Sequence, residues 1–141
     1  MITYRAAKFD DVEKIHKLLN DYAKAGLMLP RSRNAIYENL RDYIVAMQGS
    51  HLVGCGALHF VWDRLAEIRS LAVDPELKCT GIGRNIVELL EKEGIERGVK
   101  MFFTLTYQPG FFAKCNYIET AKEKLPQKVW KECVYCPQYP Y

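Results

Sequence analysis

Apolar residues recur at helical spacing in the first part of the chain. Six of them follow the three-to-four-residue period of a helix face packed on a core: Phe9, Val12, Ile15, Leu18, Leu19 and Tyr22. Asp10 and Glu13 have the spacing of a capping box at the start of this helix. Gly26 is a typical residue to follow a helix end. The pattern therefore predicts an amphipathic helix that ends before Gly26.

Two further helices and a helical turn are expected. A short helix is predicted over residues 33–42, with Ile36 and Leu40 on one face. The clearest helix covers residues 82–97, because apolar residues recur on one face while Glu and Lys occupy the other, and Gly98 follows. Pro109 is suited to the first position of a helical turn over residues 109–115.

Strands are predicted where apolar residues alternate or run continuously between turn residues. The predicted ranges are 2–5, 43–47, 52–62, 65–73, 101–106 and 129–135. A turn at residues 48–50 makes the second and third ranges a hairpin, and Pro75 cannot continue the ladder of residues 65–73. The order β-α-α-β-β-β-α-β-α-β indicates an α/β fold with a mixed sheet covered by helices.

Length and composition narrow the class of protein. The chain has 141 residues, of which 49% are apolar and 26% charged, with a formal net charge of +3. These values predict one globular domain over residues 1–141 and argue against a disordered chain or a nucleic-acid binder that relies on a basic field. The longest mostly apolar stretch, residues 52–62, is shorter than the roughly 20 residues of a membrane span. We therefore expect no membrane partner and a cytoplasmic protein.

The cysteines do not predict a disulfide framework or a metal centre. Their number is odd and no secretion signal precedes them: Cys55, Cys79, Cys115, Cys133 and Cys136. Cys133 and Cys136 form one C-x-x-C pair, whereas a structural zinc site needs further ligands that the sequence does not supply nearby. We expect reduced thiols and no required metal, and a site completed by residues after Tyr141 stays open.

The segment 67–84 has the features of an anion-binding loop. A predicted strand runs through a glycine-containing turn into the helix of residues 82–97, whose first N–H groups and dipole attract negative charge. Gly81 and Gly83 allow a phosphate to approach the backbone, and Lys78 and Arg84 add positive charge. The segment lacks the Lys-Ser/Thr of a Walker A loop and the third small residue of a Rossmann fingerprint, because Ile86 stands there.

The pattern Lys78-x-x-Gly81-x-Gly83 after the LAV strand resembles motif A of the GNAT N-acetyltransferase superfamily. The family pattern is Gln/Arg-x-x-Gly-x-Gly/Ala, so Lys78 is a conservative departure, while Cys79 stands where glycine is common. The segment FFAKCNY at 111–117 resembles a second family motif, with Phe112 and Asn116 in place of Tyr and Gly. The resemblance implies a mixed, mainly antiparallel sheet flanked by helices, and acetyl-CoA as cosubstrate.

Four other segments narrow the resemblance. They are GLMLPRS at 26–32, LAEIRSLAV at 65–73, FTLTYQPGFF at 103–112 and KLPQKVWKECVYCP at 124–137. Together they resemble single-domain N-acetylglutamate synthases, which begin arginine biosynthesis, and related amino-acid N-acetyltransferases. This resemblance implies acetyl transfer to the α-amine of a small amino acid, with L-glutamate favoured.

The resemblance also implies a role for individual residues. Glu67 would be the general base and the Leu71 N–H would bind the oxyanion, while Thr106 or Tyr107 would donate to the leaving thiolate. Acetyl-CoA would be held by the strand end and the loop after it: Leu71, Ala72, Val73, Lys78, Cys79, Thr80, Gly81, Ile82, Gly83 and Arg84. Arg31 is the first candidate for the acceptor carboxylate, because arginine binds carboxylates in a bidentate manner. Arg33, Arg69, Lys128 and Lys131 are weaker candidates.

Other interpretations remain at this stage. A solvated ion pair between Glu67 and Arg69 would explain both residues without catalysis, and His59 is a minor alternative as the base. The acceptor could instead be a protein N-terminus or lysine. The chain could also be a non-catalytic acyl-CoA-binding regulatory module. An exposed strand edge, usual in this fold, makes a homodimer plausible.

Overall fold

The structure is a computed structural model that describes residues 1–106 and 108–119. In this part, five strands form one sheet in chain order: β1 (Ile2–Ala6), β2 (Tyr43–Gln48), β3 (His51–Trp62), β4 (Leu65–Val73) and β5 (Met101–Phe103). The first three pairings are antiparallel, and β4 pairs with β5 in parallel. The predicted mixed, mainly antiparallel sheet is confirmed.

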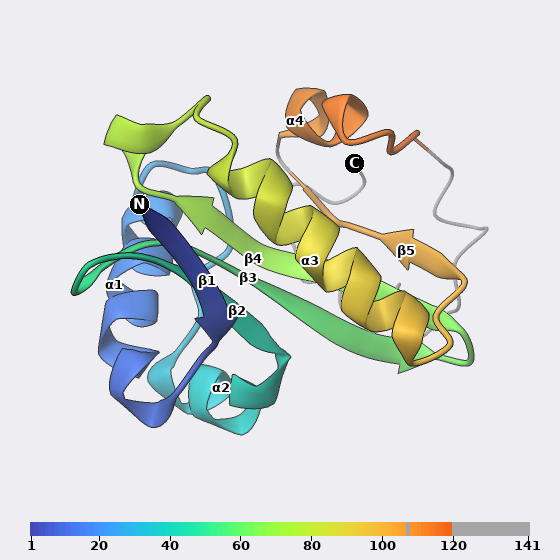
Figure 1. The fold of residues 1–141 in the computed structure, drawn as a ribbon, viewed down its shortest axis with the longest axis horizontal. Coiled ribbons are helices and arrows are strands. Elements are labelled where there is room, and N and C mark those ends of the chain that lie inside the picture. Colours follow the sequence, from blue (N-terminus) through green and yellow to red (C-terminus); the bar gives the residue numbers. More distant parts are fainter. Residues whose placement is uncertain (107, 120–141) are drawn as a thin grey trace.

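Helices lie on both faces of this sheet (Figure 1). One face is covered by α1 (Val12–Lys24) and α2 (Arg33–Glu38), and the other by α3 (Ile82–Glu96). The short helix α4 (Pro109–Lys114) follows β5, and three 3-10 turns complete the order: η1 (Phe9–Asp11), η2 (Leu40–Asp42) and η3 (Pro75–Leu77). No helix within residues 1–106 and 108–119 is both long and apolar enough to cross a bilayer.

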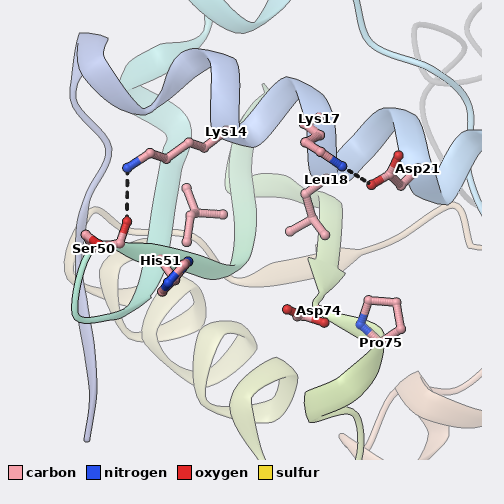
Figure 2. Close-up of a pocket in the computed structure, with 9 residues that line it drawn as sticks. Lys14, Lys17, Leu18, Asp21, Ser50, His51, Asp74 and Pro75 are labelled. Carbon is pink, nitrogen blue, oxygen red and sulfur yellow. Dashed lines mark hydrogen bonds and ion pairs between the residues drawn. The ribbon is translucent and has the colours of Figure 1, made fainter.

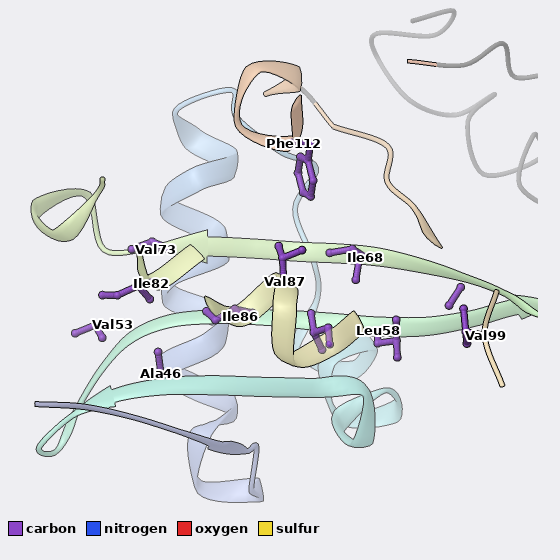
Figure 3. Close-up of a cluster of buried hydrophobic side chains, with 12 residues drawn as sticks. Ala46, Val53, Leu58, Ile68, Val73, Ile82, Ile86, Val87, Val99 and Phe112 are labelled. Atoms are coloured by element: carbon purple, nitrogen blue, oxygen red, sulfur yellow. The ribbon is translucent and has the colours of Figure 1, made fainter. Parts of the chain in front are cut away.

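The core consists mainly of two apolar clusters separated by the sheet. On the first face, buried residues of α1 and α2 pack on β2 and β3. On the second face, α3 packs against β2, β3 and β4 (Figure 3). Gly56 of β3 allows α3 to lie this close, because a Cβ atom there would be 2.7 Å from Ile86 Cγ2 and 3.3 Å from Leu90 Cδ1. The contact fixes the distance between the sheet and the helix that begins after the glycine loop.

Several element boundaries differ from the sequence predictions. The predicted helix over residues 33–42 divides into α2 and η2, with Asn39 between them. The strand predicted over residues 101–106 ends at Phe103, where the Thr104 hydroxyl donates to the Ile68 carbonyl at 2.8 Å in place of a further backbone pair. The strand predicted over residues 129–135 lies outside the described residues.

The start of the first helical segment is fixed by Asp11 rather than by a box of Asp10 and Glu13. The Asp11 carboxylate accepts hydrogen bonds from the Lys8 N–H at 2.7 Å and from Nη1 and Nη2 of Arg5, at 2.7 and 3.0 Å. The side chain is almost fully buried, and the hydrogen bond from Arg5 is the main cause that lowers the pKa of Asp11. Asp11 therefore joins β1 to the start of α1 as an anion.

Asp11→Asn should lower the free energy of unfolding at pH 7 by about 2 kcal/mol, the range for hydrogen bonds to charged groups. Because the folded-state pKa of Asp11 is lowered, its stabilisation is present above its unfolded pKa and disappears as pH falls below about 4. Urea unfolding at pH 7 and pH 3 measures both effects. Asp10→Asn is the matched control at an exposed position. Equal losses of unfolding free energy in Asp11→Asn and Asp10→Asn would contradict the role of Asp11 as the anion that joins β1 to the start of α1.

Candidate active site

The geometry of β4 differs from a regular strand at the centre of the site. Two of its residues, Ser70 and Leu71, lie opposite the single residue Gly56 of β3, and Ser70 has a φ of +56°. In a regular strand the side chains of Glu67, Arg69, Leu71 and Val73 would share one face. Because of the bulge, Glu67 and Arg69 lie on the α1–α2 face, while Leu71 packs with the α3 cluster.

Glu67 and Arg69 form a buried ion pair. The Arg69 Nη2 donates to Glu67 Oε1 at 2.8 Å, and Glu67 is only 4% exposed. A solvated surface pair is therefore excluded. Glu67 is one of two charged residues that are buried in the described part of the chain, the other being Asp11. A buried carboxylate beside an opening in the sheet is a candidate acid–base group.

That opening forms where β5 leaves β4. The two strands pair only from Leu65 to Glu67 on β4, and beyond this point they diverge (Figure 1). The stretch from Ile68 to Val73, which contains Leu71, therefore has no neighbouring strand on this side within the described residues. An extended ligand can pair with such an edge in the manner of a strand.

Tyr22 covers the far end of this edge. Its hydroxyl donates to the Val73 carbonyl at 2.7 Å and accepts the Val73 N–H at 3.1 Å. Burial raises the pKa of Tyr22, so the phenol stays protonated and can donate. The Lys78 ammonium lies 5.4 Å from the centre of the Tyr22 ring. Backbone pairing between Val73 and an extended ligand therefore requires that Tyr22 moves away, a relation that the sequence did not indicate.

The loop before α3 fits a phosphate-containing ligand. Gly81 is the N-cap residue with a φ of +91°, no side chain caps the helix, and a Cβ at Gly81 would meet nothing within 4 Å. Lys78, Cys79, Thr80 and Gly81 are all exposed. The loop that leads to the positive end of the α3 dipole is therefore uncovered, while Ile82 and Gly83 at the start of the helix are buried. Arg84 is exposed beside this loop. It forms an ion pair with Glu88, in which Arg84 Nε lies 3.4 Å from Glu88 Oε1.

Two substitutions relative to the family motifs have a structural explanation. Cys79 has a φ of +65° and Asn116 a φ of +71°, in the left-handed region that favours glycine and tolerates asparagine. Cys79 therefore holds the loop in the conformation of the usual glycine, at a cost of about 1 kcal/mol. Phe112 is buried against Phe111 and Tyr117, so its ring packs in the core and does not line the opening.

A small cleft on the α1–α2 face contains the predicted acceptor residues Arg31 and Arg69. Its other lining residues come from α2, the turn after it and the adjoining strands: Ala35, Asn39, Asp42, Tyr43 and Ala57. Arg31 is half-buried, and Arg69 already binds Glu67. The cleft therefore contains Arg31 together with Arg69, the residue that binds the buried Glu67.

A larger hollow, of about 390 Å³, lies elsewhere on the molecule (Figure 2). It is open to solvent and lies between α1, the start of β3 and the residues after β4. Its charged groups have partners, because Lys17 binds Asp21 at 3.0 Å and Lys14 donates to the Ser50 carbonyl at 3.1 Å. This hollow contains none of the predicted site residues.

The structure describes only some of the remaining predicted residues. The Thr106 hydroxyl accepts the Gln108 N–H at 2.8 Å, which leaves its own proton available for donation. Tyr107, Lys128, Lys131, Cys133 and Cys136 lie outside the described residues. Burial raises the pKa of Cys55 to about 12, so this thiol is not a nucleophile at neutral pH.

Comparisons with known proteins agree with the fold. The model of the acetyltransferase (GNAT) family matches residues 12–117. An uncharacterized N-acetyltransferase of Chlorobaculum tepidum is 43% identical over 134 residues, which cover 95% of this chain and 86% of that protein. The chain therefore belongs to the GNAT acetyltransferase family. It is an acyltransferase that uses acetyl-CoA, and the alternative of a non-catalytic module is not supported.

Two further proteins are similar to the chain. The amino-acid acetyltransferase of Mycobacterium tuberculosis is 34% identical over 131 residues, which cover 91% of this chain and 75% of that protein. The structure of N-acetylglutamate synthase from Neisseria gonorrhoeae, complexed with coenzyme A and N-acetyl-glutamate, superposes with a TM-score of 0.88 at 24% identity. The alignment covers 94% of this chain and 32% of that one, and at this identity it shows the fold alone.

Proposed function

We propose that the chain transfers the acetyl group of acetyl-CoA to the α-amine of a small acidic amino acid, with L-glutamate as the favoured acceptor. The observation that carries this proposal is the buried Glu67 beside a cleft with two arginines, at the point where β4 and β5 diverge. The similarity to an amino-acid acetyltransferase supports the same acceptor class. The product would be N-acetylglutamate, the compound that begins arginine biosynthesis.

In this proposal each residue acts on a stated atom. Glu67 removes a proton from the acceptor ammonium, because only a neutral amine attacks a thioester. The Leu71 N–H, on the stretch of β4 that no other strand within residues 1–106 and 108–119 pairs on this side, donates to the thioester oxygen as it becomes negative. Thr106 or Tyr107 donates a hydroxyl proton to the departing thiolate and is reprotonated by the second proton that the attacking nitrogen loses as the amide forms. Lys78, Arg84 and the first N–H groups of α3 hold the phosphates.

A covalent enzyme intermediate is not part of the proposal. Cys55 is buried with a raised pKa, and burial also raises the pKa of Cys115. Cys79 is exposed on the loop assigned to the phosphates. Transfer is therefore direct, and both substrates are bound when the amine attacks.

Mass spectrometry of reaction products tests the acceptor. The protein is incubated with acetyl-CoA and each free amino acid, and separately with a mixed peptide pool. N-acetylglutamate as the dominant product supports the proposal. Acetylated peptides without acetylated amino acids would instead support a protein acetyltransferase, and acetyl transfer to another free amino acid would retain the mechanism with a different acceptor.

Arg31→Ala should raise the KM for glutamate by about 10- to 100-fold. This is the expected effect of losing a hydrogen bond to a charged group, which contributes about 1.5–3 kcal/mol of binding free energy. The KM for acetyl-CoA should stay within about twofold, since Arg31 lies on the acceptor side. Arg33→Ala is the matched control, because Arg33 is exposed and binds Glu13 at 2.9 Å. An unchanged KM for glutamate in Arg31→Ala would contradict the acceptor cleft.

A further inference from the structure

Tyr22 of α1 binds both backbone groups of Val73, the last residue of β4. Its hydroxyl donates to the Val73 carbonyl and accepts the Val73 N–H, so one phenol satisfies the groups that a partner strand would otherwise satisfy. The ring packs in the apolar cluster on the α1–α2 face, and the residue is only 6% exposed. The hydroxyl therefore stands where a backbone amide of a paired chain would stand.

The two backbone groups of Val73 point to the open side of β4. On the opposite side, the Asp74 N–H donates to the Val53 carbonyl of β3 at 2.8 Å. Bonded and non-bonded residues alternate along an antiparallel ladder, so the N–H and the carbonyl of Val73 point away from β3. On that side β4 has no partner strand beyond Glu67 within residues 1–106 and 108–119. Tyr22 therefore closes the end of the edge with which an extended ligand can pair.

Lys78 connects Tyr22 to the loop before α3. Its ammonium lies 5.4 Å from the centre of the Tyr22 ring, within the range of a cation–π contact. Lys78 itself is exposed and belongs to the loop that the proposed function assigns to the donor phosphates. A phosphate that attracts this ammonium removes its contact with the ring. Phosphate binding at the loop therefore weakens one of the contacts that hold Tyr22 in place.

We propose that Tyr22 occupies the place of the donor's amide-bearing arm on Val73 and is displaced when acetyl-CoA binds. The amides of this extended arm can donate and accept as the phenol does, so the exchange replaces one set of hydrogen bonds by another. Tyr22 is then a specificity-determining residue for the donor, because a nucleotide that lacks the arm leaves it in place. The inference rests on the open edge of β4 as the donor site of the proposed function.

A tyrosine with a purely structural role would behave differently. A hydroxyl that only stabilises the fold contributes equally with and without the donor, so its removal leaves the donor affinity unchanged. A hydroxyl that binds the donor weakens binding when it is removed. A hydroxyl that the donor displaces stabilises the free protein alone, so its removal destabilises the free protein and raises the donor affinity. The sign of the change in donor affinity therefore separates the three roles.

Tyr22→Phe tests the displacement, because it removes the hydroxyl and keeps the ring next to Lys78. Calorimetric titration with coenzyme A should give a Kd about 5- to 30-fold lower than that of the unmodified protein, the equivalent of one or two neutral hydrogen bonds. The Kd for adenosine 3′-phosphate 5′-diphosphate, which has the phosphates but no arm, should stay within about twofold. An unchanged or higher Kd for coenzyme A would overturn the proposal, as would an equal gain for the nucleotide.

Thermal unfolding measures the same displacement from the other direction. Without ligand, Tyr22→Phe should melt at a lower temperature than the unmodified protein, because the backbone groups of Val73 lose their partner. With saturating coenzyme A this difference should become small, since the hydroxyl no longer contributes in either protein. A difference that stays the same with coenzyme A would show that the donor does not displace Tyr22.

Tyr117→Phe is the matched control. The Tyr117 hydroxyl donates to Glu91 Oε2 at 2.7 Å, so this variant also loses a tyrosine hydrogen bond of that length, but one to a side chain of α3. Its Kd for coenzyme A should remain within about twofold of that of the unmodified protein. Equal tightening in both variants would indicate a general loosening of the fold and would exclude the role of Tyr22.

The outcome also separates this inference from the proposed function. Binding of coenzyme A is measured without an amine, so the identity of the acceptor does not affect the result. If N-acetylglutamate is the product but Tyr22→Phe does not bind coenzyme A more tightly, only the displacement is wrong. If another amine is acetylated and Tyr22→Phe binds coenzyme A more tightly, the acceptor assignment is wrong and the displacement is supported.

Discussion

Glu67→Gln should lower kcat by about 10²- to 10⁴-fold, the range for the contribution of a positioned general base. The amide retains an oxygen that accepts the Arg69 hydrogen bond, so the fold and the acceptor cleft should persist. The KM for acetyl-CoA should change little, because the phosphate loop lies beyond Val73. Steady-state kinetics with both substrates measures the effect. The residual rate should rise with pH, since more of the free acceptor amine is then neutral.

A matched control is available for this variant. Glu13→Gln also removes the charge of a glutamate bound to an arginine, in a pair that measures 2.9 Å but is exposed at both ends. Its kcat should remain within about twofold of that of the unmodified protein, because surface pairs contribute little. Comparable losses in the two variants would indicate a general effect of charge and would exclude Glu67 as the base.

Gly56→Val should reduce the free energy of unfolding by about 3 kcal/mol or more, because overpacking of a filled core is strongly destabilising. The added Cβ alone would lie 2.7 Å from Ile86 Cγ2, and Ile86 and Leu90 are fully buried and have no space to move into. Urea unfolding measures the loss. Gly110→Ala is the control, since a Cβ there meets nothing within 4 Å.

A double-mutant cycle isolates the contact. Gly56→Ala combined with Ile86→Ala should cost clearly less than the sum of the two single losses, because the second change removes the atom that the first one strikes. Strict additivity would show that Gly56 does not set the distance between β3 and α3.

The sequence predicted the elements whose ends are determined locally. The strand over residues 65–73 has the predicted bounds, because the Asp-Pro step stops the ladder. Helix α3 begins after Gly81 and ends at Glu96, one residue before the predicted end, with Arg97 between it and Gly98. The family and its cosubstrate could be predicted because the glycine loop and the helix start are adjacent in the chain.

The missed features depend on contacts between distant residues. The bulge at Ser70 requires a positive φ at a residue type with no sequence signal for it, and it moved Leu71 to the opposite face from Glu67. The early end of β5 depends on Thr104 bonding to Ile68, 36 residues away. The Tyr22–Val73 contact joins residues 51 positions apart. His59 Nδ1 lies 2.9 Å from Asp42 Oδ2, a contact that was also missed, since a histidine in a strand is usually structural.

The chain order of the strands has a consequence for how the molecule forms. β2, β3 and β4 are joined by two-residue turns and pair antiparallel, so residues 43–73 can build a meander from local contacts. During synthesis from the N-terminus, residues 43–73 leave the ribosome before α3 does. The register that sets His59 opposite Glu67 lies entirely within this meander. The edge of β4 beyond Glu67 is defined only when β5, which is synthesised later, pairs with residues 65–67.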